Sequence, residues 1–102
     1  MISCHEEIRH VKMRELLQRE REYNFCEFLT LLRQTLGVTR RHMGKDIKIS
    51  EHVIFNWESG NFQSAIKIHN LVTVADYFSV SMRLLQKKMI EYLEERKNEN
   101  KI

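Results

Sequence analysis

The chain has 102 residues, which is enough for one small domain whose core needs neither disulfides nor a metal ion. It contains no proline and only three glycines, and this composition favours an all-helical fold. The formal net charge of +3, from 17 basic and 14 acidic side chains, permits nucleic-acid binding, and two cysteines are too few for a disulfide-rich secreted scaffold.

The first residues argue against export. The segment MISCHEEIRH is charged near its start, unlike a signal peptide, and no apolar run in the chain approaches the length of a membrane span. Cys4 and Cys26 are expected to be free thiols in a reducing compartment. We therefore expect a cytoplasmic protein that does not contact a membrane.

Residues 1–23 are predicted to form an N-terminal helical extension. Ser3 and Glu6 have the spacing of a capping box, and a charged helix with a weak apolar stripe is expected to follow to about Glu22. This extension could bind a partner or a second copy, or it could pack as an arm on the domain's own surface. A zinc set could be drawn from Cys4, His5, His10 and Cys26. Adjacent Cys and His lack the usual ligand spacing, so we expect no metal and no other cofactor.

Three predicted helices occupy the middle of the chain. The first covers about 24–36 and has a regular apolar face: Phe25, Phe28, Leu29, Leu32 and Leu36. Thr39 and Ser50 are expected N-caps of two short helices, over about 40–47 and 51–59, and Gly60 is a natural stop. Gly44 is expected to let these two short helices cross closely. Helices this short bury little alone, so they must sit on a larger helical body.

Two more helices are predicted after residue 60. Ser64 is the expected N-cap of a helix over about 65–78, and the apolar positions of this helix are predicted to be core: Ile68, Leu71, Val72, Ala75 and Phe78. A last helix begins near Met82. Its apolar stripe outlasts the domain and is predicted to be a dimer or partner surface: Leu85, Met89, Tyr92 and Leu93. Residues 94–102 are expected to be a solvated, frayed tail.

Five motifs between residues 25 and 85 have the spacing of a known family. They are Leu32-Arg33-x-x-x-Gly37-x-Thr39, Met43-Gly44, Ile49-Ser50, Ile54-x-x-Trp57-Glu58-x-Gly60 and Leu71-x-x-Val74-Ala75-x-x-Phe78-x-Val80-Ser81. Together they resemble the helix-turn-helix domain of the XRE/lambda-repressor-like family. The resemblance implies an all-α, five-helix domain over 24–86, with the added N-terminal helix over 1–23 and a C-terminal helix extension and frayed tail over 87–102.

The resemblance also implies a way of binding DNA. The helix over 51–59 would enter the major groove, and the helix over 40–47 would anchor on the DNA backbone. Arg33 would pair with Glu58 as a structural clamp, the other interpretation being a contact between Arg33 and a phosphate. The candidate DNA-binding residues are Thr39, Arg40, Arg41, Lys48, Ser50, Glu51, His52, Phe55, Asn56 and Asn61.

The side chains at these positions suggest particular contacts. Arg40 can hold a phosphate or reach a guanine, Asn56 can pair with adenine, and His52 can donate to guanine or phosphate. Glu51 can accept from cytosine N4, or it can only stabilise the helix through the dipole. Phe55 could touch a thymine methyl group, or it could mark a surface meant for protein.

Two departures from the family pattern keep two functions open. The helix over 51–59 has no Arg, Lys or Gln, and Lys48 replaces the usual glycine of the turn. The first hypothesis is a sequence-specific DNA-binding transcriptional regulator, a repressor, that acts as a homodimer on double-stranded DNA. The alternative is an antitoxin-like or other protein-interaction module, with a toxin or another regulator as partner and weak or lost DNA readout. The chain has no nucleophile with a paired base and no phosphate loop, so we expect no enzyme.

Overall fold

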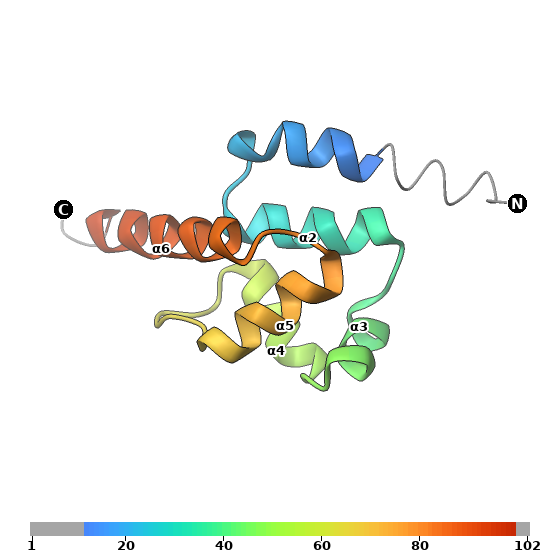
Figure 1. Ribbon diagram of the computed structural model, residues 1–102. Coiled ribbons are helices and arrows are strands. Elements are labelled where there is room, and N and C mark those ends of the chain that lie inside the picture. Colours follow the sequence, from blue (N-terminus) through green and yellow to red (C-terminus); the bar gives the residue numbers. More distant parts are fainter. Residues whose placement is uncertain (1–11, 100–102) are drawn as a thin grey trace, which may run out of the picture.

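The computed structural model describes residues 12–99, which are all-helical and contain no strand in that range (Figure 1). A helical segment over 12–18 comes first. It is followed by η1 (Glu20–Glu22), α2 (Phe25–Leu36), α3 (Arg40–Ile47), α4 (Glu51–Ser59), α5 (Ile68–Phe78) and α6 (Met82–Glu99). None of the described helices combines the length and the apolar character that crossing a membrane requires. The predicted capping box at Ser3 and three of the four drawn zinc ligands, Cys4, His5 and His10, lie outside the described residues.

Side-chain caps explain why α2, α3 and α4 begin where they do. Asn24 and Glu27 form a capping box, in which each side chain accepts a hydrogen bond from the other's backbone N–H. The Thr39 hydroxyl accepts from the N–H of His42 at 3.0 Å, and Ser50 caps α4 in the same way. Gly60 ends α4 in the left-handed conformation. The predicted helices over 24–36, 40–47 and 51–59 are confirmed.

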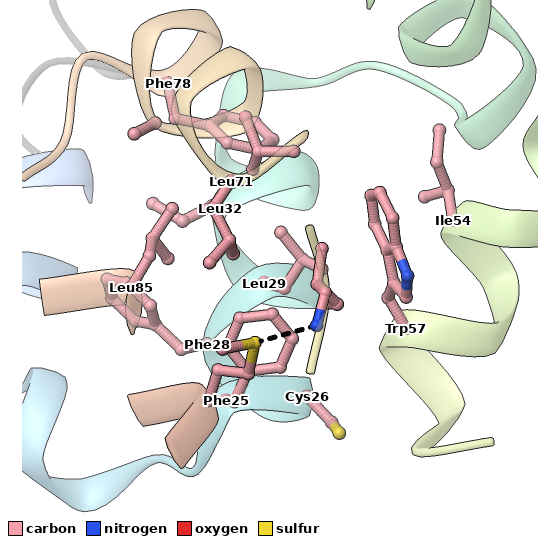
Figure 2. Close-up of a cluster of buried hydrophobic side chains, with 14 of the residues drawn as sticks. Phe25, Cys26, Phe28, Leu29, Leu32, Ile54, Trp57, Leu71, Phe78 and Leu85 are labelled. Atoms are coloured by element: carbon pink, nitrogen blue, oxygen red, sulfur yellow. Dashed lines mark hydrogen bonds between the residues drawn. The ribbon is translucent and has the colours of Figure 1, made fainter. Parts of the chain in front are cut away.

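The core is built around α2, which contacts α4, α5 and α6. Three of its side chains, Phe28, Leu29 and Leu32, are fully buried. Figure 2 shows them surrounded by side chains from the other three helices: Ile54 and Trp57 of α4, Leu71 and Phe78 of α5, and Leu85 of α6. Because α2 touches three helices at once, it is the body on which α4 rests, and α3 packs in turn on α4 and α5.

The start of α5 differs from the prediction. The helix begins at Ile68, and Ser64 lies in the preceding loop and caps nothing. Ile66 of that loop is buried instead, and its N–H donates to Met89 Sδ at 3.2 Å, the contact drawn as a dashed line in Figure 2. The loop therefore supplies a core side chain of its own. Ile68 and Val72 were predicted to be core, but they are 62% and 40% exposed because the buried face of α5 is the one that carries Val74.

The predicted dimer or partner surface on α6 is wrong for the first two of its four residues. Leu85 and Met89 are 0% and 3% exposed, because they close the core over α2 and Ile66. Tyr92 and Leu93 are half-buried and pack against the same core. The stripe is therefore an internal packing face. A domain boundary at residue 86 would separate Met89 from the core to which it belongs.

The C-terminal part of α6 is also more ordered than predicted. The helix continues to Glu99, so the residues 94–99 are helical and not a frayed tail. Arg96 Nη1 donates to the carbonyl oxygens of Gly60, at 2.6 Å, and Phe62, at 2.7 Å. The centroids of the Phe62 and Tyr92 rings lie 5.5 Å apart. These contacts fasten α6 to the loop that follows α4.

The N-terminal segment packs on the domain over the part that the structure describes. Leu16 is buried in the core. Lys88 of α6 donates through Nζ to the carbonyl oxygens of Glu20 and Tyr23, at 2.6 and 2.7 Å, and pairs with the Glu20 carboxylate at 2.9 Å. Figure 1 shows this segment running alongside α2 and folding back toward α6. Of the two interpretations of the extension, residues 12–23 support the packing arm.

Candidate nucleic-acid interface

The short helices α3 and α4 cross at Gly44. A Cβ atom at this position would lie 2.5 Å from the carbonyl oxygen of Ile49, too close for any side chain without a backbone shift. The N–H of Ile49 donates to the Gly44 carbonyl at 3.1 Å and closes the turn. Lys48 occupies that turn with φ of 60°, so this lysine takes the left-handed conformation that usually favours glycine. The expected close crossing at Gly44 is confirmed.

The N-terminal turns of α3 and α4 border a shared groove of about 570 Å³. Its lining residues are Arg33, Thr39, Arg40, Arg41, Glu51, His52 and Phe55. A shallower hollow of about 340 Å³ adjoins it at the turn, and Arg41, Gly44, Lys45, Lys48, Ile49, Ser50 and Glu51 line this hollow. All the predicted DNA-binding residues except Asn56 and Asn61 therefore lie on one continuous surface.

Asn56 and Asn61 lie at the far end of α4. The side-chain amide of Asn61 donates to Asn56 Oδ1 at 3.4 Å, and the backbone N–H of Asn61 donates to the Asn56 carbonyl at 2.8 Å. Asn56 is half-buried, whereas Asn61 is exposed. These two residues pair with each other at the end of the helix and do not line the groove.

Two arginines that line the groove, Arg33 and Arg40, share a buried carboxylate that does not itself line it. The Glu58 side chain is 2% exposed and accepts from Arg33 Nε at 2.8 Å and Arg33 Nη2 at 3.2 Å, so the predicted clamp is confirmed. Arg40 Nε donates to the same carboxylate at 2.9 Å. Sequence reasoning missed this second pairing and assigned Arg40 to DNA alone. A carboxylate so deeply buried needs such partners, because an unpaired charge in an apolar interior is strongly unfavourable.

Arg40 also contacts the outward face of α4. Its guanidinium lies 5.1 Å from the ring centroid of Phe55, a cation–π contact. The Arg40 side chain is 38% exposed, and among the described residues only its Nε has a hydrogen-bond partner. Its two terminal nitrogens thus remain available to a ligand in the groove.

The outer rim of the groove is basic along α3. Arg41, Lys45 and Lys48 are exposed, whereas His42 lies 3.3 Å from the Asp46 carboxylate. The exposed start of α4 contributes one acidic residue, Glu51. Positive charge therefore follows α3 and the turn, and the outward face of α4 is neutral or acidic.

The far end of α3 is held by α5. Tyr77 donates its hydroxyl hydrogen to Asp46 Oδ2 at 2.7 Å. Burial and then this bond to the carboxylate raise the pKa of Tyr77 to about 12. The contact fixes the position of α3 relative to the body of the domain, and with it the basic rim.

Comparisons of the chain with protein-family models, with curated proteins and with solved structures find no match.

Proposed function

We propose that the chain is a sequence-specific DNA-binding transcriptional regulator, a repressor of the XRE/lambda-repressor-like kind, which acts as a cytoplasmic homodimer and inserts α4 into the major groove. The observation that carries the proposal is the groove shared by α3 and α4. Two capped helix N-termini open onto it, and Arg40 and Arg41 line it. A helix N-terminus with adjacent basic side chains suits the phosphate backbone, and the next helix suits base edges.

The two sides of this surface would have different roles. Arg41, Lys45 and Lys48 follow the exposed side of α3 and its turn, where they would contact phosphates and set the orientation of the protein. Glu51 and His52 project from the first turn of α4, where they would face base edges. Arg40 lies between the two sides, which supports either a phosphate or a guanine contact.

The homodimer belongs to the proposal because one such domain spans too few base pairs for strong specificity. Paired half-sites about one helical turn apart would need two copies. Leu85 and Met89 are buried within the monomer, so the contact between copies would have to use another part of the surface. Sedimentation of the full chain, alone and with DNA, measures the stoichiometry.

The experiment that tests DNA binding uses duplex DNA from immediately upstream of the protein's own gene, with non-specific competitor, over a range of salt concentrations. We expect tight binding that weakens steeply with salt, because each phosphate contact releases counterions. The double variant Arg41→Ala, Lys48→Ala removes two phosphate contacts from each copy, so it should flatten the slope of log K against log salt by about 3.6 for the dimer. Lys87→Ala is the matched control, because this exposed lysine of α6 lies outside both hollows. The proposal would be contradicted if non-specific competitor abolished the binding. It would also be contradicted if the wild-type chain, the double variant and Lys87→Ala all showed the same salt slope.

A protein-interaction module, such as an antitoxin, is the second candidate. The exposed residues of α4 favour it, since Val53 and Phe55 are both exposed and the helix has no Arg or Lys. A protein partner would bury both residues. Co-expression with the product of the adjacent gene, followed by gel filtration, tests this candidate. A stable complex that Val53→Ser and Phe55→Ser disrupt, in a chain that binds no specific DNA, would favour the second candidate over the first.

A further inference from the structure

Phe55 is the only large apolar side chain among the residues that line the groove. It is 45% exposed, although the other two aromatic residues near it in the chain, Trp57 and Phe62, are buried and half-buried. It lies one turn beyond Glu51 on the same face of α4. Exposure of an aromatic ring in a groove whose other lining residues are polar or charged calls for an explanation in terms of what the groove binds.

The ring is held in position by a series of contacts that begins in the core. Arg33 and Arg40 both bind the buried Glu58 carboxylate, and the Arg40 guanidinium then lies against the Phe55 ring. Because Arg40 is tethered through Nε, it limits the rotamers that Phe55 can adopt. A ring ordered in advance loses less conformational entropy when it meets a ligand.

The chemistry of the groove indicates which ligand group the ring would meet. Aromatic carbon offers no hydrogen bond to a base edge, and the only apolar group that bases present in the major groove is the C5-methyl group of thymine. Arg40 lies against the ring, and Thr39 and Arg41, which are polar and cationic, line the same groove. Two arginines and the capped N-terminus of α3 border the groove and suit a phosphate backbone, so this setting favours DNA over a protein partner.

We infer that Phe55 reads the C5-methyl group of a thymine, and that Arg40, tethered to Glu58, is the positioning residue that holds the ring against it. The inference rests on the proposed DNA-binding function and deepens it, because it names a base and the side chain that selects it. Arg40 keeps two terminal nitrogens for an acceptor beside that thymine, either a phosphate or a guanine.

The test begins with the full chain and a library of duplexes with random sequence. The most enriched duplex is then made again with deoxyuridine in place of thymine, one position at a time. Deoxyuridine keeps every hydrogen-bonding group of thymine and lacks only the methyl group. We expect one position in each half-site where this replacement weakens binding about fourfold, the effect of one buried methyl group, and no change elsewhere.

Variants assign the effect to Phe55. The Phe55→Ala variant should bind the thymine duplex and the duplex with deoxyuridine at the sensitive position with equal affinity. Together the two proteins and the two duplexes form a double-mutant cycle between the Phe55 side chain and the methyl group. Val53→Ala is the matched control: it removes an exposed apolar side chain of α4 that does not line the groove, and it should keep the fourfold ratio. Arg40→Ala should lower the ratio without loss of helicity, and Arg40→Lys, which retains a cation near the ring, should restore part of it.

The possible results distinguish a failure of the thymine inference from a failure of the DNA-binding function. Specific binding with no sensitivity to any thymine replacement, or a Phe55→Ala variant that keeps the ratio, overturns the inference and leaves the DNA-binding function standing. A library in which no sequence is enriched overturns both, and Phe55 then belongs to a protein-binding surface. A fourfold ratio that only Phe55 and Arg40 variants reduce establishes the inference.

Discussion

Arg33 and Arg40 share one carboxylate but have different surroundings. The Arg33 side chain is 12% exposed, binds Glu58 through two nitrogens and donates a further bond to the carbonyl of Val38. Arg40 meets Glu58 through one nitrogen from the solvent side. Buried ion pairs contribute little net stability compared with apolar packing, but removal of one partner leaves a buried charge uncompensated. The two arginines should therefore differ in their effect on folding.

This difference can be measured by urea unfolding. Arg33→Ala should lower the free energy of unfolding by about 3 kcal/mol, the low end for a broken buried pair, because Glu58 loses its bidentate partner and keeps only the single bond from Arg40. Arg40→Ala should lower it by about 1 kcal/mol or less, because this pair is partly solvated. Equal losses in the two variants would mean that Arg40 is as structural as Arg33.

At the residue scale, the family resemblance implied one half of this arrangement. In the family that the motifs resemble, the residues at the positions of Arg33 and Glu58 pair, and the pair is present here. The pairing of Arg40 with Glu58 could not be predicted in the same way, because a long side chain at the start of a helix can turn toward solvent or toward its neighbour. Only the close crossing of α3 and α4 brings Glu58 within its reach.

At the scale of helices, the crossing at Gly44 sets the geometry of the groove. Gly44→Ala would improve the intrinsic helix propensity of α3 by about 1 kcal/mol. The added Cβ would press on the backbone oxygen of Ile49, and overpacking of this kind costs about 1–3 kcal/mol. We expect a net loss of stability, measured as a lower thermal midpoint. Lys45→Ala, at an exposed position of the same helix, is the control and should have little effect. A higher midpoint for Gly44→Ala would show that the turn at Ile49 moves aside easily.

The contact between α5 and α3 predicts a dependence of stability on pH. The pKa of Tyr77 is raised by burial and by Asp46 from 10 in the unfolded chain to about 12 in the folded protein. The folded state therefore holds this proton more tightly, so the contribution to stability is complete below pH 10 and is lost as the pH rises toward 12. Urea midpoints should fall more steeply over this range for the wild-type chain than for Tyr77→Phe. Parallel curves for the two proteins would argue against the Tyr77–Asp46 contact.

The helices themselves were predictable to different degrees. Thr39 and Ser50 are followed directly by helical spacing, and both are caps. Ser64 has the same local appearance, but Ile66 gains more by filling the core beside Met89 than by joining a helix. The apolar positions of α5 fit two overlapping helical faces, and periodicity alone does not decide which face a third element will cover.

At the scale of the whole molecule, the described parts of the two extensions, residues 12–23 and 87–99, pack on the domain and belong to it. Lys88 binds the end of the N-terminal segment, and Arg96 binds the loop after α4. The apolar stripe on α6 was assigned to a dimer or partner surface because the family resemblance ends near residue 85 and leaves the stripe with no predicted surface to cover. Which surface that stripe covers depends on where the chain returns in space, and this is not visible in the spacing of one helix. The all-helical class, in contrast, followed from composition and caps.

The shared carboxylate of Glu58 also has an evolutionary consequence. Arg33 and Glu58 satisfy each other inside the molecule, so a change at either position leaves an unbalanced buried group unless the other changes in the same lineage. Arg40 reaches that carboxylate from the solvent side, and Phe55 lies outside the core. We therefore expect positions 33 and 58 to change together in descendant sequences, and positions 40 and 55 to change independently of them. Substitutions that alter the surface of the groove can then accumulate without substitutions that alter the stability of the fold.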